Sequence, residues 1–202
     1  MKNHVLYISL ICFLCINVSI NAQSSTKFSE EKFGNIMDYN PFYDYTTHQL
    51  SNVDTIPGFK SKQNKLKLHG TIYEKDGVTP AKNVVLYIEQ ADENGNFDLR
   101  TQNNVKYVYN RGWIQTNADG QYTFYTYVPG NDRRYNILKE LFPVIKEPSK
   151  KEYEIETLLF DDDPLLSKFC RKRIAKKSDI TRILSVKEEN GLLVANKDIV
   201  LQ

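Results

Sequence analysis

The sequence predicts a mainly β protein, a β-sandwich with one short helix near the C-terminus. Two observations favour this fold class. Short apolar stretches alternate with polar residues at a period of two, and turn signals rich in Gly and Asn separate them. Aromatic residues make up 12% of the 202-residue chain, and aromatic side chains favour strands. Many short strands joined by tight turns are typical of a sandwich.

The first strands are expected from residue 65 onward. Leu66, Leu68 and Ile72 alternate with polar neighbours, which predicts a strand with one buried face. Residues 111–116 and 121–128 flank the sequence NADG, which predicts a hairpin. Further strands are expected at residues 84–88, 144–146, 153–160, 183–186 and 192–201.

Alternation along residues 121–128 separates two faces. Tyr122, Phe124 and Val128 would share one face, and Tyr125 and Tyr127 would lie on the other.

The helix is expected to follow residue 163. Asp163 is a suitable N-cap, and Pro164 suits the first helical position. Leu166, Cys170 and Ile174 recur at a spacing of four, which predicts one apolar helix face.

The N-terminus is typical of a secretory signal. Lys2 precedes an apolar stretch at residues 5–18, and cleavage is expected after Ala22. The stretch is shorter than the roughly 20 apolar residues of a membrane span, so no stable span is expected after cleavage. The organisation is then a signal peptide at 1–22, an N-terminal arm at 23–64 and a sandwich domain at 65–202. The mature protein would be secreted or periplasmic.

The arm and the charge pattern bear on partners. The aromatic sequence YNPFYDY at 39–45 would pack on the domain or dock on a partner. The net charge of +2 is too small to argue for nucleic acid or an anionic membrane as a partner. The basic segment 171–177 is typical of a solvated helix face, with heparin or nucleic acid binding as the alternative. After signal removal only Cys170 remains, so no internal disulfide is expected.

Several motifs occur together in one order along the chain. They are HGTIYEKDGVTPAKNVVLYIEQADENGNF (69–97), RGWIQTNADGQYTFYTYVPG (111–130), VIKEP (144–148), FDDDPLL (160–166) and NGLLVANKDIVL (190–201). Over residues 50–201 the chain resembles the intradiol ring-cleavage dioxygenases, especially small secreted bacterial members. The resemblance implies a prealbumin-like β-sandwich that binds non-haem Fe(III) through two tyrosines and two histidines. It implies cleavage of catechol-type rings with O₂.

The residues at the expected ligand positions depart from this pattern. The resemblance places Phe97 and Asp132 where the family has tyrosines, and Glu140 and Phe142 where it has histidines. No histidine follows His69. Ferric iron favours hard anionic and imidazole donors, so the sequence predicts that these positions are degenerate, with no catalytic residue and no metal ligand. No cofactor is expected, and Fe(III) would be bound only if the family activity were retained.

Two hypotheses follow. The first is a secreted, catalytically degenerate protein that acts as a binding or scaffold module for a small aromatic ligand, a glycan or a protein partner. The alternative is an active Fe(III) intradiol dioxygenase with relocated ligands. Tyr109, Asp132, Tyr135 and Glu140 would form an all-oxygen site that favours Ca²⁺, Mg²⁺ or Mn²⁺. A candidate pocket comprises Tyr107, Tyr109, Arg111 and Tyr135.

Overall fold

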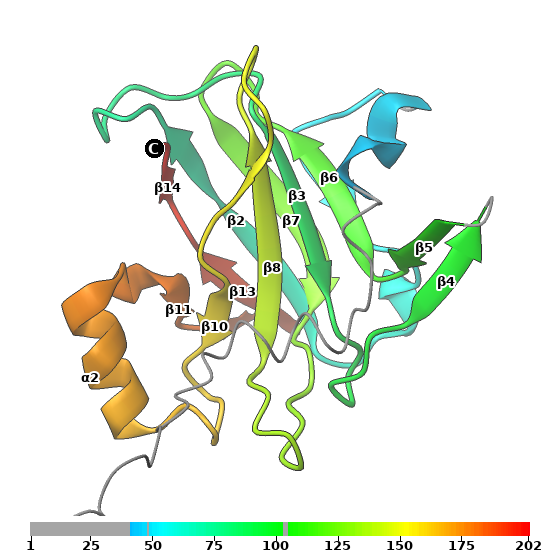
Figure 1. Cartoon of the computed structure of the whole chain (residues 1–202), viewed down its shortest axis with the longest axis vertical. Coiled ribbons are helices and arrows are strands. Elements are labelled where there is room, and N and C mark those ends of the chain that lie inside the picture. Colours follow the sequence, from blue (N-terminus) through cyan, green and yellow to red (C-terminus); the bar gives the residue numbers. More distant parts are fainter. Residues whose placement is uncertain (1–40, 48, 103–104) are drawn as a thin grey trace, which may run out of the picture. The chain divides into compact units, whose positions relative to one another are not determined.

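The computed structural model describes residues 41–47, 49–102 and 105–202. The predicted signal peptide and the arm up to residue 40 lie outside the described residues. Figure 1 shows the predicted mainly β architecture, with strands packed in layers. The strands are β1 Val53–Thr55, β2 Lys65–Tyr73, β3 Val85–Gln90, β4 Leu99–Gln102, β5 Val105–Val108, β6 Arg111–Gln115, β7 Gln121–Tyr127, β8 Glu140–Lys146, β9 Tyr153–Glu154, β10 Leu158–Phe160, β11 Ile183–Leu184, β12 Lys187–Glu189, β13 Leu192–Asn196 and β14 Ile199–Val200. The helices are η2 Pro41–Thr47, η3 Phe59–Ser61, α2 Lys168–Lys177 and η4 Ile180–Arg182.

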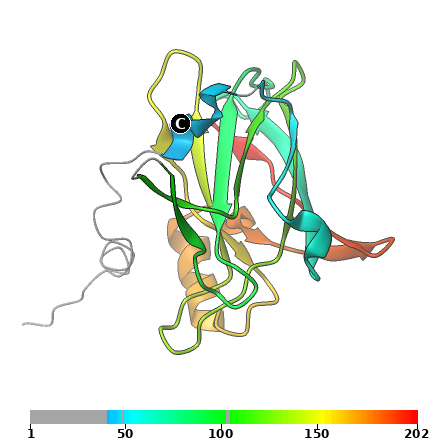
Figure 2. The ribbon, with the colours of Figure 1, turned by 90° about the vertical axis from the view of Figure 1, so that its right-hand side faces the viewer.

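The described strands form two larger sheets and one hairpin. One sheet has the order β1-β7-β2-β13-β12, with β14 also paired to β2. The other has the order β11-β10-β8-β3-β6, with β9 paired to β8. The hairpin β4–β5, dark green in Figures 1 and 2, stands off one side of these sheets. The predicted β-sandwich with a short helix near the C-terminus is therefore confirmed.

The core lies between the two larger sheets, and alternation along each strand supplies it. In β2 every second residue is buried, as the period-two pattern predicts. Leu66, Leu68 and Ile72 are all fully buried there. Tyr122 and Phe124 from β7 and Leu141 and Ile145 from β8 join the same cluster.

The hairpin predicted around NADG is wrong. β6 and β7 belong to different sheets, so residues 116–120 carry the chain from one sheet to the other. Oδ1 of Asn117 accepts hydrogen bonds from the backbone N of Asp119 and of Gln121, which shapes a local turn. The ends of the turn bind elsewhere. Thr116 Oγ1 donates to Ala81 O at 2.7 Å, and Gly120 O accepts from Ile72 N at 2.8 Å.

A second link between the sheets involves Tyr127, which was expected on the face opposite Tyr122 and Phe124. Its side chain is fully buried, and its hydroxyl donates to Ala91 O at 3.0 Å. Beside it, Gln90 of β3 donates to Tyr127 O and accepts from the hydroxyl of Thr126 in β7. Buried polar groups of both sheets are thereby satisfied, which avoids the cost of desolvating them unpaired.

The predicted start of the helix is also wrong. α2 begins at Lys168, and Ser167 is the N-cap, because its Oγ accepts from Cys170 N at 3.1 Å. Asp163 lies four residues earlier and is buried. Its carboxylate accepts from Asn131 Nδ2, Lys139 N and Leu165 N at 2.7–2.9 Å. It therefore ties the loop before β8 to the segment before α2.

The aromatic segment of the arm packs on its own domain. Phe42 of η2 is 1% exposed and packs against Tyr87 of β3, with Tyr45 and Trp113 beside them. The Trp113 indole N donates to Phe42 O at 2.9 Å. η2 therefore covers part of the outer face of the β8-β3-β6 sheet.

Phe42→Ala tests how much this cover contributes to stability. We expect the free energy of unfolding to fall by about 3 kcal/mol, because a buried phenyl ring is replaced by a cavity. Tyr43→Phe is the matched control, since it removes only a partly exposed hydroxyl that bonds to Glu152 and should cost less than about 1 kcal/mol. Urea unfolding measures both. If Phe42→Ala lowers the free energy of unfolding as little as Tyr43→Phe does, η2 is only loosely attached to the sheet.

Gly120→Ala tests the crossing between the sheets, with Gly77→Ala as control. Both glycines have positive φ, +68° and +74°, so both substitutions strain the backbone by about 1 kcal/mol. At Gly120 a Cβ would lie only 2.5 Å from Ile72 O, whereas nothing lies within 4 Å at Gly77. We expect Gly120→Ala to cost at least about 2 kcal/mol more in urea unfolding. Similar losses would mean that the contact with β2 is dispensable.

Candidate functional site

The candidate site lies on the outer face of the β8-β3-β6 sheet. Because side chains alternate along a strand, residues 140, 142, 144 and 146 of β8 face away from the core. Pairing with β3 and β6 aligns the outward residues in three cross-strand rows. The rows are Gln115–Val85–Lys146, Trp113–Tyr87–Val144 and Arg111–Glu89–Phe142.

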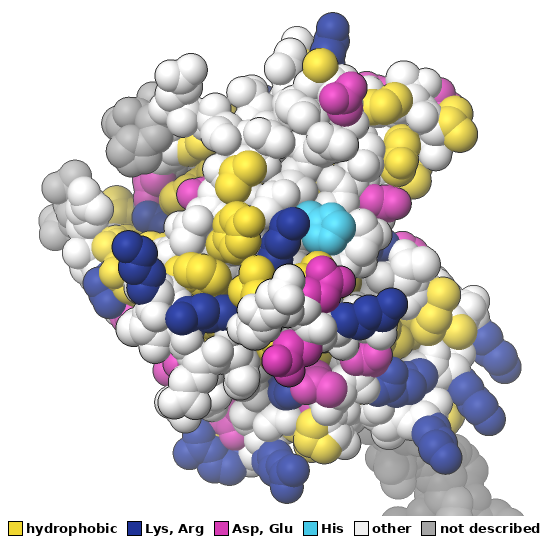
Figure 3. Space-filling view, turned by 180° about the vertical axis from the view of Figure 1, so that it is seen from behind, with side chains coloured by type: hydrophobic (Ala, Val, Ile, Leu, Met, Phe, Trp, Pro, Cys, Tyr) yellow, Lys and Arg dark blue, Asp and Glu magenta, His cyan; other side chains and the backbone are white. Residues whose placement is uncertain are grey.

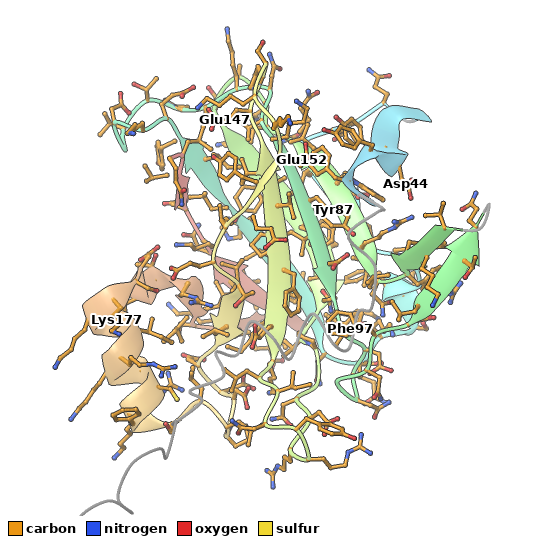
Figure 4. All side chains as sticks on the ribbon, in the orientation of Figure 1. Asp44, Tyr87, Phe97, Glu147, Glu152 and Lys177 are labelled. Atoms are coloured by element: carbon orange, nitrogen blue, oxygen red, sulfur yellow. The ribbon has the colours of Figure 1, made fainter. Side chains whose placement is uncertain are left out.

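The middle row is apolar and covered. Phe42 lies against Tyr87, and the rings of Tyr87 and Trp113 are 5.2 Å apart at their centroids. In Figure 4, Tyr87 lies on the strand face near Asp44 of η2, and Phe97 lies toward the other end of the strands. Packing of this kind excludes water from the middle of the face.

The third row joins charge to aromatic rings. Arg111 is 9% exposed, and its guanidinium carbon lies 4.1 Å from the Tyr107 ring centroid and 5.0 Å from the Trp113 ring centroid. Its Nη2 donates to Asp44 Oδ2 at 2.5 Å, which attaches η2 to β6.

Next to Arg111, the Tyr87 hydroxyl donates to Glu89 Oε2 at 2.5 Å. Burial raises the pKa of Glu89 above its usual range, against the lowering effects of the Tyr87 hydrogen bond and of Arg111. Burial and the nearby Glu89 carboxylate raise the pKa of the Tyr87 hydroxyl well above its usual value. Tyr87 is therefore held in its protonated, hydrogen-bonding form.

The residues at the expected iron-ligand positions have other partners. The rings of Phe97 and Phe142 pack together, with centroids 5.6 Å apart and planes tilted by 58°. Asp132 is 3% exposed, and both its carboxylate oxygens accept from Arg134, at 2.9–3.1 Å. Burial raises the pKa of Glu140, opposed by a hydrogen bond from Thr157.

These side chains do not fit an Fe(III) site of the tyrosine and histidine type. Phe97 and Phe142 carry no donor atom, and both Asp132 oxygens are bound by Arg134. In the part of the chain that the structure describes, no group of three or more His, Cys, Asp or Glu side chains is placed to hold a metal ion. The assignment of the four positions comes from the sequence resemblance and stays a prediction.

The relocated ligand set and the candidate pocket are only partly brought together. Arg111 and Tyr107 are in contact, as above. Tyr109 instead lies under Arg100, whose guanidinium carbon is 3.1 Å from the ring centroid. Tyr135 is 57% exposed, with Arg134 over its ring.

The row Gln115–Val85–Lys146 forms the floor of an open groove that the sequence did not predict. The groove has a volume of about 480 Å³. It is lined by Tyr45, Asn83, Val85, Gln115, Lys146, Glu147 and Pro148. Its residues come from η2, three strands and two loops, so no local motif indicates it. Figure 4 shows Glu147 and Glu152 near this end of the strands.

Comparisons with known proteins identify the fold through solved structures. No family model matches the sequence, and no curated protein matches it. Among solved structures, the dioxygenase domain of a dioxygenase and carbohydrate-binding fusion from Streptomyces sp. SirexAA-E is 21% identical, with a TM-score of 0.57. The match covers 73% of this chain and 85% of that one.

Two other structures give the same result. 3-Chlorocatechol 1,2-dioxygenase from Rhodococcus opacus 1CP is 16% identical, with a TM-score of 0.53 over 75% of this chain and 66% of that one. An intradiol ring-cleavage dioxygenase from Tetranychus urticae is 15% identical, with a TM-score of 0.52 over 76% and 87% of the two chains. The chain therefore has the β-sandwich fold of the intradiol ring-cleavage dioxygenases.

Proposed function

We propose that this protein is a secreted, non-catalytic binding module built on the intradiol dioxygenase fold. The observation that carries the proposal is the contact between Phe97 and Phe142. The resemblance expects a tyrosine and a histidine at these positions, and two phenyl rings occupy them instead. A metal-dependent ring cleavage needs donors to hold the metal that binds and activates the diol.

The other two expected ligand positions, Asp132 and Glu140, also support a non-catalytic protein. Asp132 forms a fork-to-fork pair with Arg134, so a cation would have to displace a guanidinium from both of its oxygens. Glu140 has Thr157 as its hydrogen-bond partner and Arg182 as a nearby positive charge. Secretion rests on the signal-like sequence at residues 1–22.

Iron content and the visible spectrum test the proposal. The protein would be incubated with ferric and ferrous salts under air and desalted, with an active intradiol dioxygenase treated in parallel. We expect substoichiometric iron, a flat visible spectrum and no consumption of catechol, because two of the four positions carry no donor. Stoichiometric iron with a tyrosinate charge-transfer band would instead establish the relocated-ligand enzyme.

The open groove suggests what such a module binds. Tyr45 offers an aromatic ring, and Gln115 and Asn83 offer neutral amides. The two charged lining residues, Lys146 and Glu147, are both bound to Lys150. An aromatic ring with several hydrogen-bonding groups in an open groove suits a neutral, polyhydroxylated ligand such as an oligosaccharide. The neighbouring dioxygenase domain that occurs in a fusion with a carbohydrate-binding protein is consistent with a glycan ligand.

Gln115→Ala tests the groove, and Gln63→Ala is the matched control on an exposed loop. A panel of neutral oligosaccharides would be screened by calorimetry with the unchanged protein. For any ligand found, we expect Gln115→Ala to weaken binding about tenfold, the value of one or two hydrogen bonds, and Gln63→Ala to leave it unchanged. No binding by any saccharide, or equal binding by both variants, would exclude the groove as a glycan site.

A further inference from the structure

α2 carries a strongly basic surface that the outer-face site does not use. Six of its ten residues are Lys or Arg, and none is acidic. At about 100° per residue, Lys168, Lys172 and Lys176 form a row along one side of the helix. Arg173 and Lys177 lie on the other side of the same exposed face.

Phe169 lies in the middle of this face. Its side chain is 73% exposed, a high value for a phenyl ring. The opposite side of the helix carries Cys170 and Ile174, both half-buried. The exposed face is therefore a phenyl ring surrounded by five exposed cations: Lys168, Lys172, Arg173, Lys176 and Lys177.

These cations have no acidic partner among the described residues. The ion pairs that the structure forms involve lysines and arginines of other elements. The remaining cation of α2, Arg171, binds the carbonyl oxygens of Asp161 and Leu166. Like charges four residues apart destabilise a helix slightly, so the row Lys168, Lys172 and Lys176 lowers the stability of α2.

Among the described residues, the position of α2 leaves this face exposed. In Figure 1, α2 lies to one side of the sandwich, and in Figure 4 Lys177 extends away from it. Figure 3, seen from behind, shows Lys and Arg side chains gathered on that same side of the molecule. No residue of α2 is fully buried, so its sequence is only weakly constrained by packing.

We propose that α2 docks this protein peripherally on an anionic lipid surface. Cationic side chains would meet lipid phosphates, and the Phe169 ring would enter the boundary between head groups and acyl chains. A sulfated polysaccharide or a nucleic acid would also meet the cations, and the Phe169 variant and the heparin and DNA arms of the test below separate these partners from a lipid surface. Among the described residues no helix is long and apolar enough to cross a bilayer.

Vesicle co-sedimentation tests the proposal with the protein purified from a host that exports it. Vesicles of phosphatidylcholine alone would be compared with vesicles in which about one lipid in three is the anionic phosphatidylglycerol. We expect binding only to the anionic vesicles, weakening as salt is raised. Binding to neither vesicle, or equally to both, would overturn the proposal.

Variants locate the surface. Replacing Lys168, Lys172 and Lys176 by Ala should lower partitioning about a hundredfold, since each cation near the surface is worth about fivefold. Alanine also favours helix, so α2 should remain folded. The matched control replaces the exposed lysines Lys60, Lys82 and Lys187 by Ala, with the same change of net charge. An equal loss in the control would show that net charge alone drives binding and would overturn the proposal.

Phe169→Ala separates a lipid surface from other polyanions. We expect about a tenfold loss of vesicle binding, because an apolar ring no longer leaves water. Retention on a heparin column should be unchanged by this substitution. If Phe169→Ala leaves vesicle binding intact, or if the protein binds heparin or DNA but not anionic vesicles, a lipid surface is excluded as the partner.

Discussion

The alternation of side chains along β8 and β3 is the constraint on which the fold and the site both depend. Inward residues such as Leu141 and Ile145 form the core between the sheets. Outward residues such as Glu140 and Phe142 contribute nothing to that core. Since the period is two, inward and outward positions can change independently. A sandwich can therefore keep its register while the chemistry of its outer face is replaced.

Side chains on the outer face and in the loop before β8 contact one another in pairs. Phe97 packs on Phe142, Asp132 binds Arg134, and Tyr87 donates to Glu89. A buried set of metal ligands without a metal would leave polar groups short of partners, at a cost to stability. These pairings give each of those polar groups a partner within the chain.

Residue periodicity in the sequence predicted strands and their buried faces correctly. The alternation of Leu66, Leu68 and Ile72 identified β2 and its buried face correctly, because strand periodicity is encoded residue by residue. The sequence also predicted the turn at Asn117, but not that this turn connects the two sheets. An Asx turn looks the same whether it closes a hairpin or carries the chain between sheets. The hydrogen bonds from Thr116 to Ala81 and from Ile72 to Gly120 distinguish the two cases, and each joins residues that are far apart in the sequence.

The same limit explains the misplaced helix start. Asp163 before a proline is a good local N-cap signal, yet its carboxylate is used by Asn131 and Lys139 from a distant loop. The helix begins at the next available cap, Ser167. At the site, the resemblance predicts missing donors at Phe97 and Phe142, and this assignment stays a prediction. Their contact, and the rows that align β8, β3 and β6, arise from strand pairing and required the structure.

Net charge is a poor guide to partners in this chain, because its two signs are used differently. Many aspartates act locally: Asp76, Asp92 and Asp179 accept backbone hydrogen bonds in turns and caps. Such carboxylates are held in place by the fold. The cations of α2 are instead collected on one exposed helix face. A total of +2 therefore conceals a local concentration of positive charge on α2. Because salt screens charges over about 10 Å, a partner at α2 interacts with that face rather than with the net charge.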